Sequence, residues 1–287
     1  MSTRFFTVTS KFVIGLTLAL VCALVSGDVL YASGKTETIT IGGTGCALGG
    51  VHAVAKAFEK THPGIRIKIV PSLGSGGGIK AVLAGSLDLA LSARPLSGAE
   101  RSQDAEAVEY ARTPFVFVNA SKAEDVALSL QQVASVYSGE RQRWPDGTPI
   151  RLVLRPETDT DTLFLKAMSP AMEKAVQQAL KRQGMLEAVT DQDNADLLVK
   201  IRGAFGASTY AQILSENRPL RPLSLDGVRP SLETLASGAY PFYKTFYAVT
   251  RHGSSSPATR RFIEYLESPE GRAILTRTGH LVAPVSK

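Results

Sequence analysis

Two glycine-rich turns are the segments of this sequence whose residue types best suit the binding of an anion. Gly42–Cys46 and Gly74–Gly78 each follow a stretch of alternating apolar residues and precede a helical pattern. Glycine permits positive φ angles and a close backbone approach. A turn that leads into a helix directs backbone N–H groups and the positive end of the helix dipole at one point. Either turn alone is equally explained as a tight connection, but a third turn, with Ser92 and Arg94, favours an anion-binding site.

The sequence lacks the signatures of the common nucleotide-binding and hydrolytic sites. Gly43 and Gly45 are followed by Gly49, one residue late for GxGxxG, and neither GxxxxGKS/T nor GxSxG occurs. The four histidines are far apart, without an HExxH motif or a Cys/His cluster. We therefore expect a binding protein with no cofactor, no metal and no catalytic residues, and keep an exported hydrolase as a minor alternative.

The amino-terminal segment has the layout of a secretory signal. Arg4 and Lys11 lie at the start, and Phe12–Gly27 then runs for sixteen residues without a charge. We expect residues 1–32 to be a signal peptide, cut at the end of this run or near Ala32, and the mature protein to be periplasmic. The alternative is an uncleaved membrane anchor, although sixteen residues is slightly short for a span.

Composition places the rest of the chain among globular proteins. With 44% hydrophobic and 20% charged residues, the chain of 287 residues is too apolar to be disordered. Its net charge of +6 is spread without a block of Lys and Arg, so we expect no nucleic-acid partner. Cys22 would leave with the signal, which makes Cys46 the one cysteine of the mature chain and excludes an intramolecular disulfide.

The order of the elements predicts an α/β fold. Thr38–Ile41 and Ile65–Val70 are expected strands, and a helical period from Val51 lies between them, which is the βαβ rhythm of a parallel sheet. Ser256–Pro257 and Ser268–Pro269 each pair an N-cap residue with proline at the first helical position, so two helices are expected near the carboxyl terminus. Two lobes, the first built from two separate stretches, are the natural division of this chain.

Four segments resemble the periplasmic phosphate-binding proteins of ABC transporters, in the same order along the chain. These segments are Gly74–Leu96, Val136–Gly139 with Trp144, Ser237–Pro241 and Ser268–Leu275. The resemblance implies a two-lobed, type II periplasmic-binding-protein (Venus flytrap) fold, in which each lobe is a mainly parallel sheet flanked by helices. It also implies a monomer that binds phosphate or a similar small oxyanion between its lobes and delivers it to a membrane permease. The expected first lobe comprises residues 33–118 and 241–287, and the second comprises residues 119–240.

The same resemblance implies the residues that contact the ligand. Arg155 falls on the arginine that begins the RxxGSGT motif of the family, and its guanidinium would pair with the anion in bidentate fashion. The expected ligand contacts are Thr44, Gly45, Cys46, Ser75, Gly76, Gly77, Ser92, Arg94, Arg155, Thr158 and Thr160.

Three departures from the family pattern leave the ligand open. After Arg155 the Gly-Ser-Gly-Thr segment is missing, and Asp159 and Asp161 either bring negative charge toward the ligand or cap the next helix and face away. Ala93 replaces a carboxylate that would accept the proton of phosphate, so selection against sulfate is not assured. Cys46 replaces a small hydroxyl residue and is either a reactive thiol in the cleft or a buried, inert one. The alternative function is therefore a sensor or interaction module of the same fold, with a different ligand or none.

Overall fold

The sheet of this protein is crossed by one long strand that belongs to both of its halves. The computed structural model describes residues 1–2, 36–119 and 127–282. Strand β4 (Ala105–Asn119) pairs along its first ten residues with β11 (Tyr243–Arg251), and its last five residues pair with β8 (Ala204–Thr209). The strand order is β2-β1-β3-β11-β4-β8-β6-β7.

The first half of the sheet is mainly parallel. Strand β1 (Glu37–Gly43) lies between β2 (Ile65–Ile69) and β3 (Leu89–Ser92) and is parallel to both, whereas β11 is antiparallel to its neighbours. The other elements of this half are α2 (Gly45–Thr61), α3 (Gly74–Leu83), α4 (Gly98–Arg101), α11 (Pro257–Glu267), α12 (Pro269–Arg277) and β12 (Leu281–Val282).

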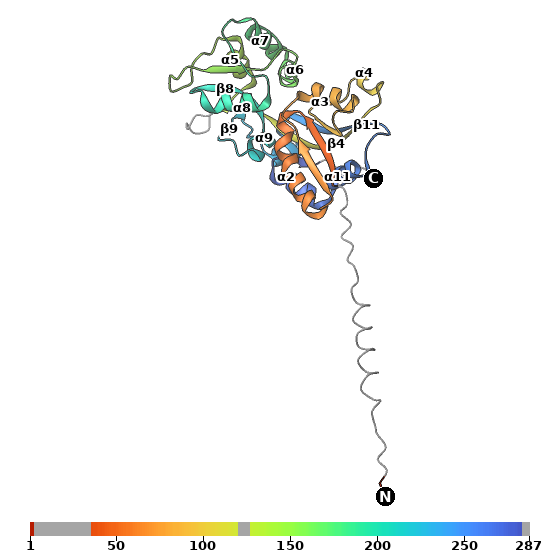
Figure 1. Ribbon diagram of the computed structural model, residues 1–287. Helices are drawn as coiled ribbons and strands as arrows, with labels where there is room; N and C mark the ends of the chain where they lie inside the picture. The colour runs from red at the N-terminus through yellow and green to blue at the C-terminus, as the bar shows by residue number, and fades with distance from the viewer. Residues whose placement is uncertain (3–35, 120–126, 283–287) are drawn as a thin grey trace. The chain divides into compact units, whose positions relative to one another are not determined.

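The second half has the same arrangement. Strand β6 (Arg151–Leu154) is parallel to both β8 and β7 (Leu186–Glu187), and β4 closes this half as an antiparallel neighbour of β8. Its helices are α5 (Leu130–Ser138), α6 (Thr160–Ala167), α7 (Pro170–Lys181), α8 (Asp191–Lys200), α9 (Tyr210–Ser215) and α10 (Leu232–Ala236), and its short strands are β5 (Ala127–Leu128), β9 (Arg221–Pro222) and β10 (Ser224–Leu225). In Figure 1, α5 and α7 lie at one end of residues 36–287, and α2 and α11 lie at the other.

The buried apolar residues divide in the same way. One group comes from residues 39–111 and 246–282 with Ala211, and includes Phe58, Phe246 and Phe262. The other comes from residues 115–240 and contains the stacked pair Phe117 and Phe205. The α/β class is confirmed, while the exact lobe boundaries expected from the sequence stay a prediction.

Both glycine-rich turns are shorter than the sequence predicted, because a helix begins inside each. Helix α2 begins at Gly45 and α3 begins at Gly74, so the N–H groups of Gly45 and Cys46, and those from Gly74 onward, lie in the first turns of these helices. Gly43 has a φ of +127°, and a Cβ there would lie 2.1 Å from the carbonyl oxygen of Leu91. Only glycine fits this position, where β1 turns into α2 against β3.

The two proline-marked helix starts are confirmed, and the predicted signal peptide is not tested. Ser256 and Ser268 cap α11 and α12, and each helix has proline in its first turn. The signal peptide of residues 1–32 lies, beyond residue 2, outside the described residues, so its cleavage stays a prediction. No helix in the described part is both long and apolar enough to span a bilayer.

Candidate anion-binding site

The amino-terminal end of α2 binds a carboxylate that the sequence analysis did not single out. Asp191 Oδ2 accepts a hydrogen bond from the backbone N–H of Cys46 at 2.9 Å and another from the hydroxyl of Thr44 at 3.3 Å. Asp191 is the first residue of α8 and is 5% exposed. An anion at a helix N-terminus is stabilised by unpaired N–H groups and by the helix dipole. The predicted anion-binding turn therefore does bind an anion, and that anion is a side chain of the protein.

The guanidinium of Arg155 lies on the other side of the same carboxylate. Arg155 follows the carboxyl end of β6, and its Nη2 is 3.5 Å from Asp191 Oδ1 and 2.8 Å from Asp159 Oδ2. Its Nη1 donates to the carbonyl oxygen of Ala188 at 3.0 Å. The side chain is 6% exposed, so protein acceptors rather than water satisfy this buried charge.

A second buried ion pair completes the cluster. Lys244 of β11 is 2% exposed, and its ammonium contacts the carboxylate of Asp161 and the hydroxyl of Thr160. Burial is the largest influence and would lower the pKa of Lys244, but Asp161, Cys46 and Asp191 together outweigh it and the pKa is raised. This pair joins β11 to the first turn of α6.

The cluster holds more carboxylates than cations. Asp159, Asp161 and Asp191 face Arg155 and Lys244, so the net charge is −1 when all five groups are ionised. Burial raises the pKa of Asp191, the Asp161 carboxylate raises it further, and Arg155 opposes both. The ionised form of Asp191 is therefore less favourable here than that of an exposed aspartate.

Gln192 links the start of α8 to the start of α2 through a hydrogen bond. Its Nε2 donates to the carbonyl oxygen of Gly45 at 3.1 Å and to Glu216 Oε1 at 2.9 Å. A Cβ on Gly45 would lie 2.3 Å from Gln192 Oε1 and 2.9 Å from Asp191 Cβ. Glycine is therefore needed at position 45 for the close approach of α8, and this approach carries Asp191 to the helix end.

The remaining predicted contacts of the first half are engaged elsewhere. Ser75 is buried and its Oγ accepts from the backbone N–H of Ala93 at 2.9 Å. The hydroxyl of Ser92 donates to the carbonyl oxygen of Arg94 at 2.7 Å. Arg94 binds Glu100 through two contacts of 2.7 and 2.8 Å, and this hydrogen-bonded pair lowers the pKa of Glu100 to about 2. The guanidinium of Arg94 therefore already binds a carboxylate, and its contact with a ligand stays a prediction.

Gly76 and Gly77 lie in the first turn of α3, as a backbone anion-binding role requires. A Cβ on Gly76 would be 3.8 Å from the Arg94 guanidinium, which therefore passes beside this turn. No described contact joins either glycine to Asp191 or Arg155. Whether they contact a ligand stays a prediction.

The segment after Arg155 resolves the two alternatives for its aspartates. Asp159 caps α6 by accepting from the backbone N–H of Asp161 at 2.8 Å, so a capping role is confirmed. It does not face away, however, because its carboxylate also pairs with Arg155. Thr160 contacts Lys244, whereas Thr158 is exposed and without a hydrogen-bond partner in the part of the chain that the structure describes.

Cys46 is a buried thiol. It is 2% exposed, and its Sγ lies 3.2 Å from the hydroxyl of Thr44. Burial raises the pKa of this thiol well above its ordinary value, and the carboxylate of Asp191 raises it further. Burial therefore disfavours the thiolate, which is the reactive form, and the reactivity of Cys46 stays a prediction.

Sequence reasoning missed Asp191, Gln192 and Lys244. Thr190–Asp193 had the pattern of a helix start, which is an ordinary cap and carries no sign of a distant partner. Lys244 was more conspicuous, because a lone lysine interrupts the strand Tyr243–Arg251, and a charge in such a place needs a partner.

Comparison with known proteins shows the family of this chain. The sequence profile of the PBP superfamily domain matches residues 31–270. The phosphate-binding protein PstS of Bacillus subtilis is 24% identical over 257 residues, which cover 85% of this chain and 80% of that protein. The protein SphX of Synechococcus elongatus is 23% identical over 270 residues, covering 84% of this chain and 76% of SphX.

Solved structures show the same fold. A Clostridium perfringens protein described as a phosphate ABC transporter substrate-binding protein, crystallised with bound phosphate, superposes with a TM-score of 0.74 at 20% identity, over 86% of this chain and all of that one. The high-affinity periplasmic phosphate-binding protein PfluDING gives 0.65 at 16% identity, over 86% of this chain and 91% of that one. The two-lobed, type II fold is confirmed. With the profile match over most of its length, the chain belongs to the PBP superfamily, in which it is similar to the PstS-like phosphate-binding proteins.

Proposed function

We propose that this protein is an exported solute-binding protein that captures phosphate, or a similar small oxyanion, at the end of α2 and delivers it to an ABC permease. One observation carries the proposal: the Cys46 N–H, the Thr44 hydroxyl and the Arg155 guanidinium converge on a single carboxylate. These are donors that an oxyanion needs, and two oxygens of the Asp191 carboxylate stand where two oxygens of the ligand would bind.

Capture then requires Asp191 to leave the helix end. The side chain is tethered, so it competes as an intramolecular ligand with an effective concentration on the order of millimolar or above. Phosphate must displace it, together with the Gln192 contact that holds α8 against α2. We infer that the lobes separate at this contact when ligand enters, and that affinity is lower than the donors alone would provide.

The nearby carboxylates favour an anion that carries a proton. Ala93 cannot accept a hydrogen bond from the ligand through its side chain, but Asp159 pairs with Arg155 and Asp161 pairs with Lys244 in the same cluster. A carboxylate repels a fully ionised anion and instead accepts a hydrogen bond from a protonated one. Monohydrogen phosphate carries such a proton at neutral pH and sulfate does not, so we infer selection of phosphate over sulfate.

The rest of the proposal follows the family. Relatives of this chain are phosphate-binding proteins, and one similar structure is periplasmic. We therefore propose export to the periplasm, a monomer with lobes divided at residues 118/119 and 240/241, and a binding role rather than an enzymatic one.

Isothermal titration of the mature protein with phosphate and with sulfate tests the proposal. We expect micromolar phosphate binding, weaker sulfate binding, and loss of both in Arg155→Gln. Arg229→Gln is the matched control. It removes the same charge from the same lobe, but at an exposed arginine. Absence of binding in a folded wild-type protein, or equal loss in both variants, would overturn it.

A second function is favoured by the same cluster. The cluster has three carboxylates and two cations, and Asp191 already occupies the amino-terminal end of α2. These features also suit a sensor or interaction module in which this site is purely structural. Under that alternative, Asp191→Asn would leave the protein unable to bind any oxyanion, whereas oxyanion capture predicts binding in this variant.

A further inference from the structure

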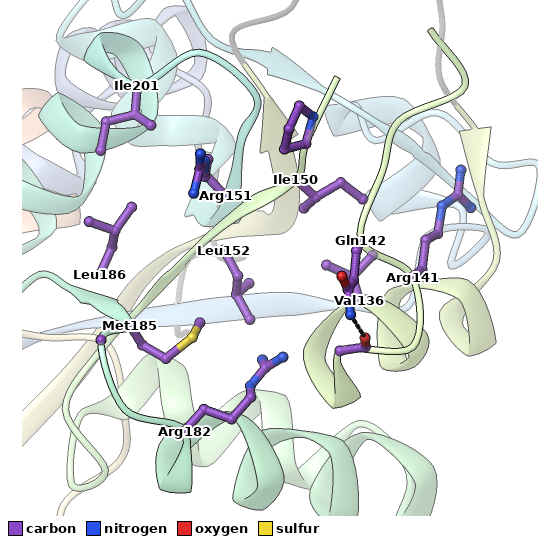
Figure 2. Close-up of a pocket in the computed structure, with 13 residues that line it drawn as sticks. Val136, Arg141, Gln142, Ile150, Arg151, Leu152, Arg182, Met185, Leu186 and Ile201 are labelled. Carbon is purple, nitrogen blue, oxygen red and sulfur yellow. Dashed lines mark hydrogen bonds between the residues drawn. The ribbon is translucent and has the colours of Figure 1, made fainter. Parts of the chain in front are cut away.

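The second lobe contains a pocket of about 530 Å³ at a distance from the anion-binding site. It is lined by the end of α5, the loop that follows it, the start of β6 and the loop between α7 and β7 (Figure 2). Pockets that bind small organic molecules are usually about 300–1,000 Å³, so the volume is that of a ligand site.

The pocket and the anion-binding site lie at opposite ends of β6. Ile150, Arg151 and Leu152 line the pocket at the amino end of this strand, whereas Arg155 follows its carboxyl end. Four residues of extended chain separate Arg151 from Arg155, which is roughly 13 Å at 3.3 Å per residue. No residue of the Asp191 cluster lines the pocket, so a ligand there would be independent of the first site.

The pocket wall is positively charged and lacks a balancing acid. Arg141, Arg151 and Arg182 line it, and no Asp or Glu does. No ion pair involves any of the three within residues 36–119 and 127–282. Arg151 is exposed and Arg141 is half-buried, so these two guanidinium groups have no protein carboxylate to compete with an incoming anion.

Arg182 is only partly satisfied by the protein. Its Nη2 donates to the carbonyl oxygen of Tyr137 at 2.7 Å, near the end of α5, and its Nη1 lies so close to Gly139 that a Cβ there would be 2.2 Å away. Its Nε is buried, and no described residue accepts a hydrogen bond from it. A buried N–H without an acceptor is costly, which points to a ligand as its partner.

The rest of the wall is aliphatic. In Figure 2 the side chains of Leu152, Met185 and Arg182 point toward one another at the centre of the view. The apolar lining residues are Val136, Ile150, Leu152, Met185, Leu186 and Ile201. A hydrated inorganic ion would leave this apolar surface uncovered, whereas an aliphatic chain would bury it.

We propose that this pocket binds an amphipathic organic anion, with a carboxylate or phosphate monoester head at Arg182 and a short aliphatic chain against the apolar wall. Arg182 anchors the head from below, while Arg141 and Arg151 at the rim attract it. This pocket is separate from the proposed oxyanion site, and the two proposals are tested independently.

Methionine methyl NMR tests the proposal in the intact mature protein. Met185 lines the pocket, whereas Met172 is fully buried in the core of the same lobe and provides an internal reference. We expect octanoate or octyl phosphate to shift the Met185 methyl resonance in a saturable way, and octanol and inorganic phosphate to leave it unchanged. A response to one of the two anions identifies the head group.

Charge variants show whether the arginines are responsible. Arg141→Gln and Arg151→Gln should each weaken binding roughly fivefold, the size expected for a partly exposed charge pair. Neither side chain has a hydrogen bond to the described chain, so both variants should fold. Arg229→Gln controls for net charge, and Arg155→Gln should leave the response intact.

Three results would overturn the proposal. The first is the absence of any Met185 shift at millimolar octanoate and octyl phosphate. The second is an equal shift with octanol, which would show apolar binding alone. The third is an equal loss in Arg229→Gln or Arg155→Gln, which would assign the effect to overall charge or to the other site.

Discussion

Asp191 and Cys46 are 145 positions apart in the chain, yet the Asp191 carboxylate accepts the Cys46 backbone N–H at 2.9 Å. The helix end that the glycine-rich turn prepares for an anion is therefore occupied by a side chain from the other lobe. In the proposed function the bound oxyanion would use the same donors as this structural contact, so a change at Asp191 should alter ligand affinity and the contact between α2 and α8 together.

Removing the charge of Asp191 should strengthen oxyanion binding. In Asp191→Asn the neutral amide is a weaker partner for the helix end and for Arg155, and it no longer repels the incoming anion. Hydrogen bonds to charged groups contribute about 1 kcal/mol more than neutral ones, so phosphate affinity should rise roughly fivefold. Isothermal titration measures this. Asp193→Asn, an exposed aspartate of the same helix, should have little effect; equal affinities in all three proteins would contradict the prediction.

Lys244→Met should strongly destabilise the protein. The variant leaves the buried Asp161 carboxylate without its partner, and breaking a buried ion pair in this way typically costs about 3–5 kcal/mol. Adding Asp161→Leu should recover most of the lost unfolding free energy, because this second change removes the unpaired charge. Urea unfolding of the single and double variants measures both effects, and a single-variant cost within error of zero would contradict the buried pairing.

Gly45→Ala should weaken the contact between α2 and α8. The added Cβ meets Gln192 Oε1 at 2.3 Å and two atoms of Asp191 at 2.9 Å, so α8 must shift. Such overpacking typically costs about 1–3 kcal/mol of unfolding free energy. Gly64→Ala is the matched control, because nothing lies within 4 Å of its Cβ. Equal urea midpoints for the two variants would show that the close approach is not tight.

His280 should make the protein less stable as the pH falls. Burial lowers the pKa of this fully buried imidazole to about 4, although its contacts with Leu275 and Thr278 oppose the shift. The unfolded chain, with a pKa near 6.5, binds the proton first, so stability declines as the pH falls from about 6.5 through 4. The loss due to this residue at pH 5 should be about 2 kcal/mol.

Urea unfolding at pH 7.5 and pH 5 checks this value. His280→Gln should lack the decline that the wild type shows, since glutamine does not titrate. The comparison of the two proteins cancels the contributions of other titrating groups, including Asp191. A pH dependence of the same size in both would place the cause elsewhere.

Local chemistry made part of the site predictable. The glycine-rich turns, the helix starts at Ser256 and Ser268, and the cap at Asp159 depend on neighbours within a few residues, and all were apparent in the pattern. Arg155 was found through the family motif, and its place beside the α2 end agrees with that expectation. The pairing of Arg94 with Glu100 is equally local, but the sequence analysis did not consider it.

The sequence by itself determined the α/β order of elements, the glycines that allow a helix end to approach an anion, and the single arginine that follows β6. The tertiary structure alone decided which charges meet: Asp191 with the end of α2, Lys244 with Asp161, and three arginines around one pocket. The physical reason is how far along the chain each interaction reaches. Backbone conformation and caps depend on the next few residues, whereas the partner of a buried charge depends on which distant elements pack together, and only the folded chain brings these within hydrogen-bonding distance.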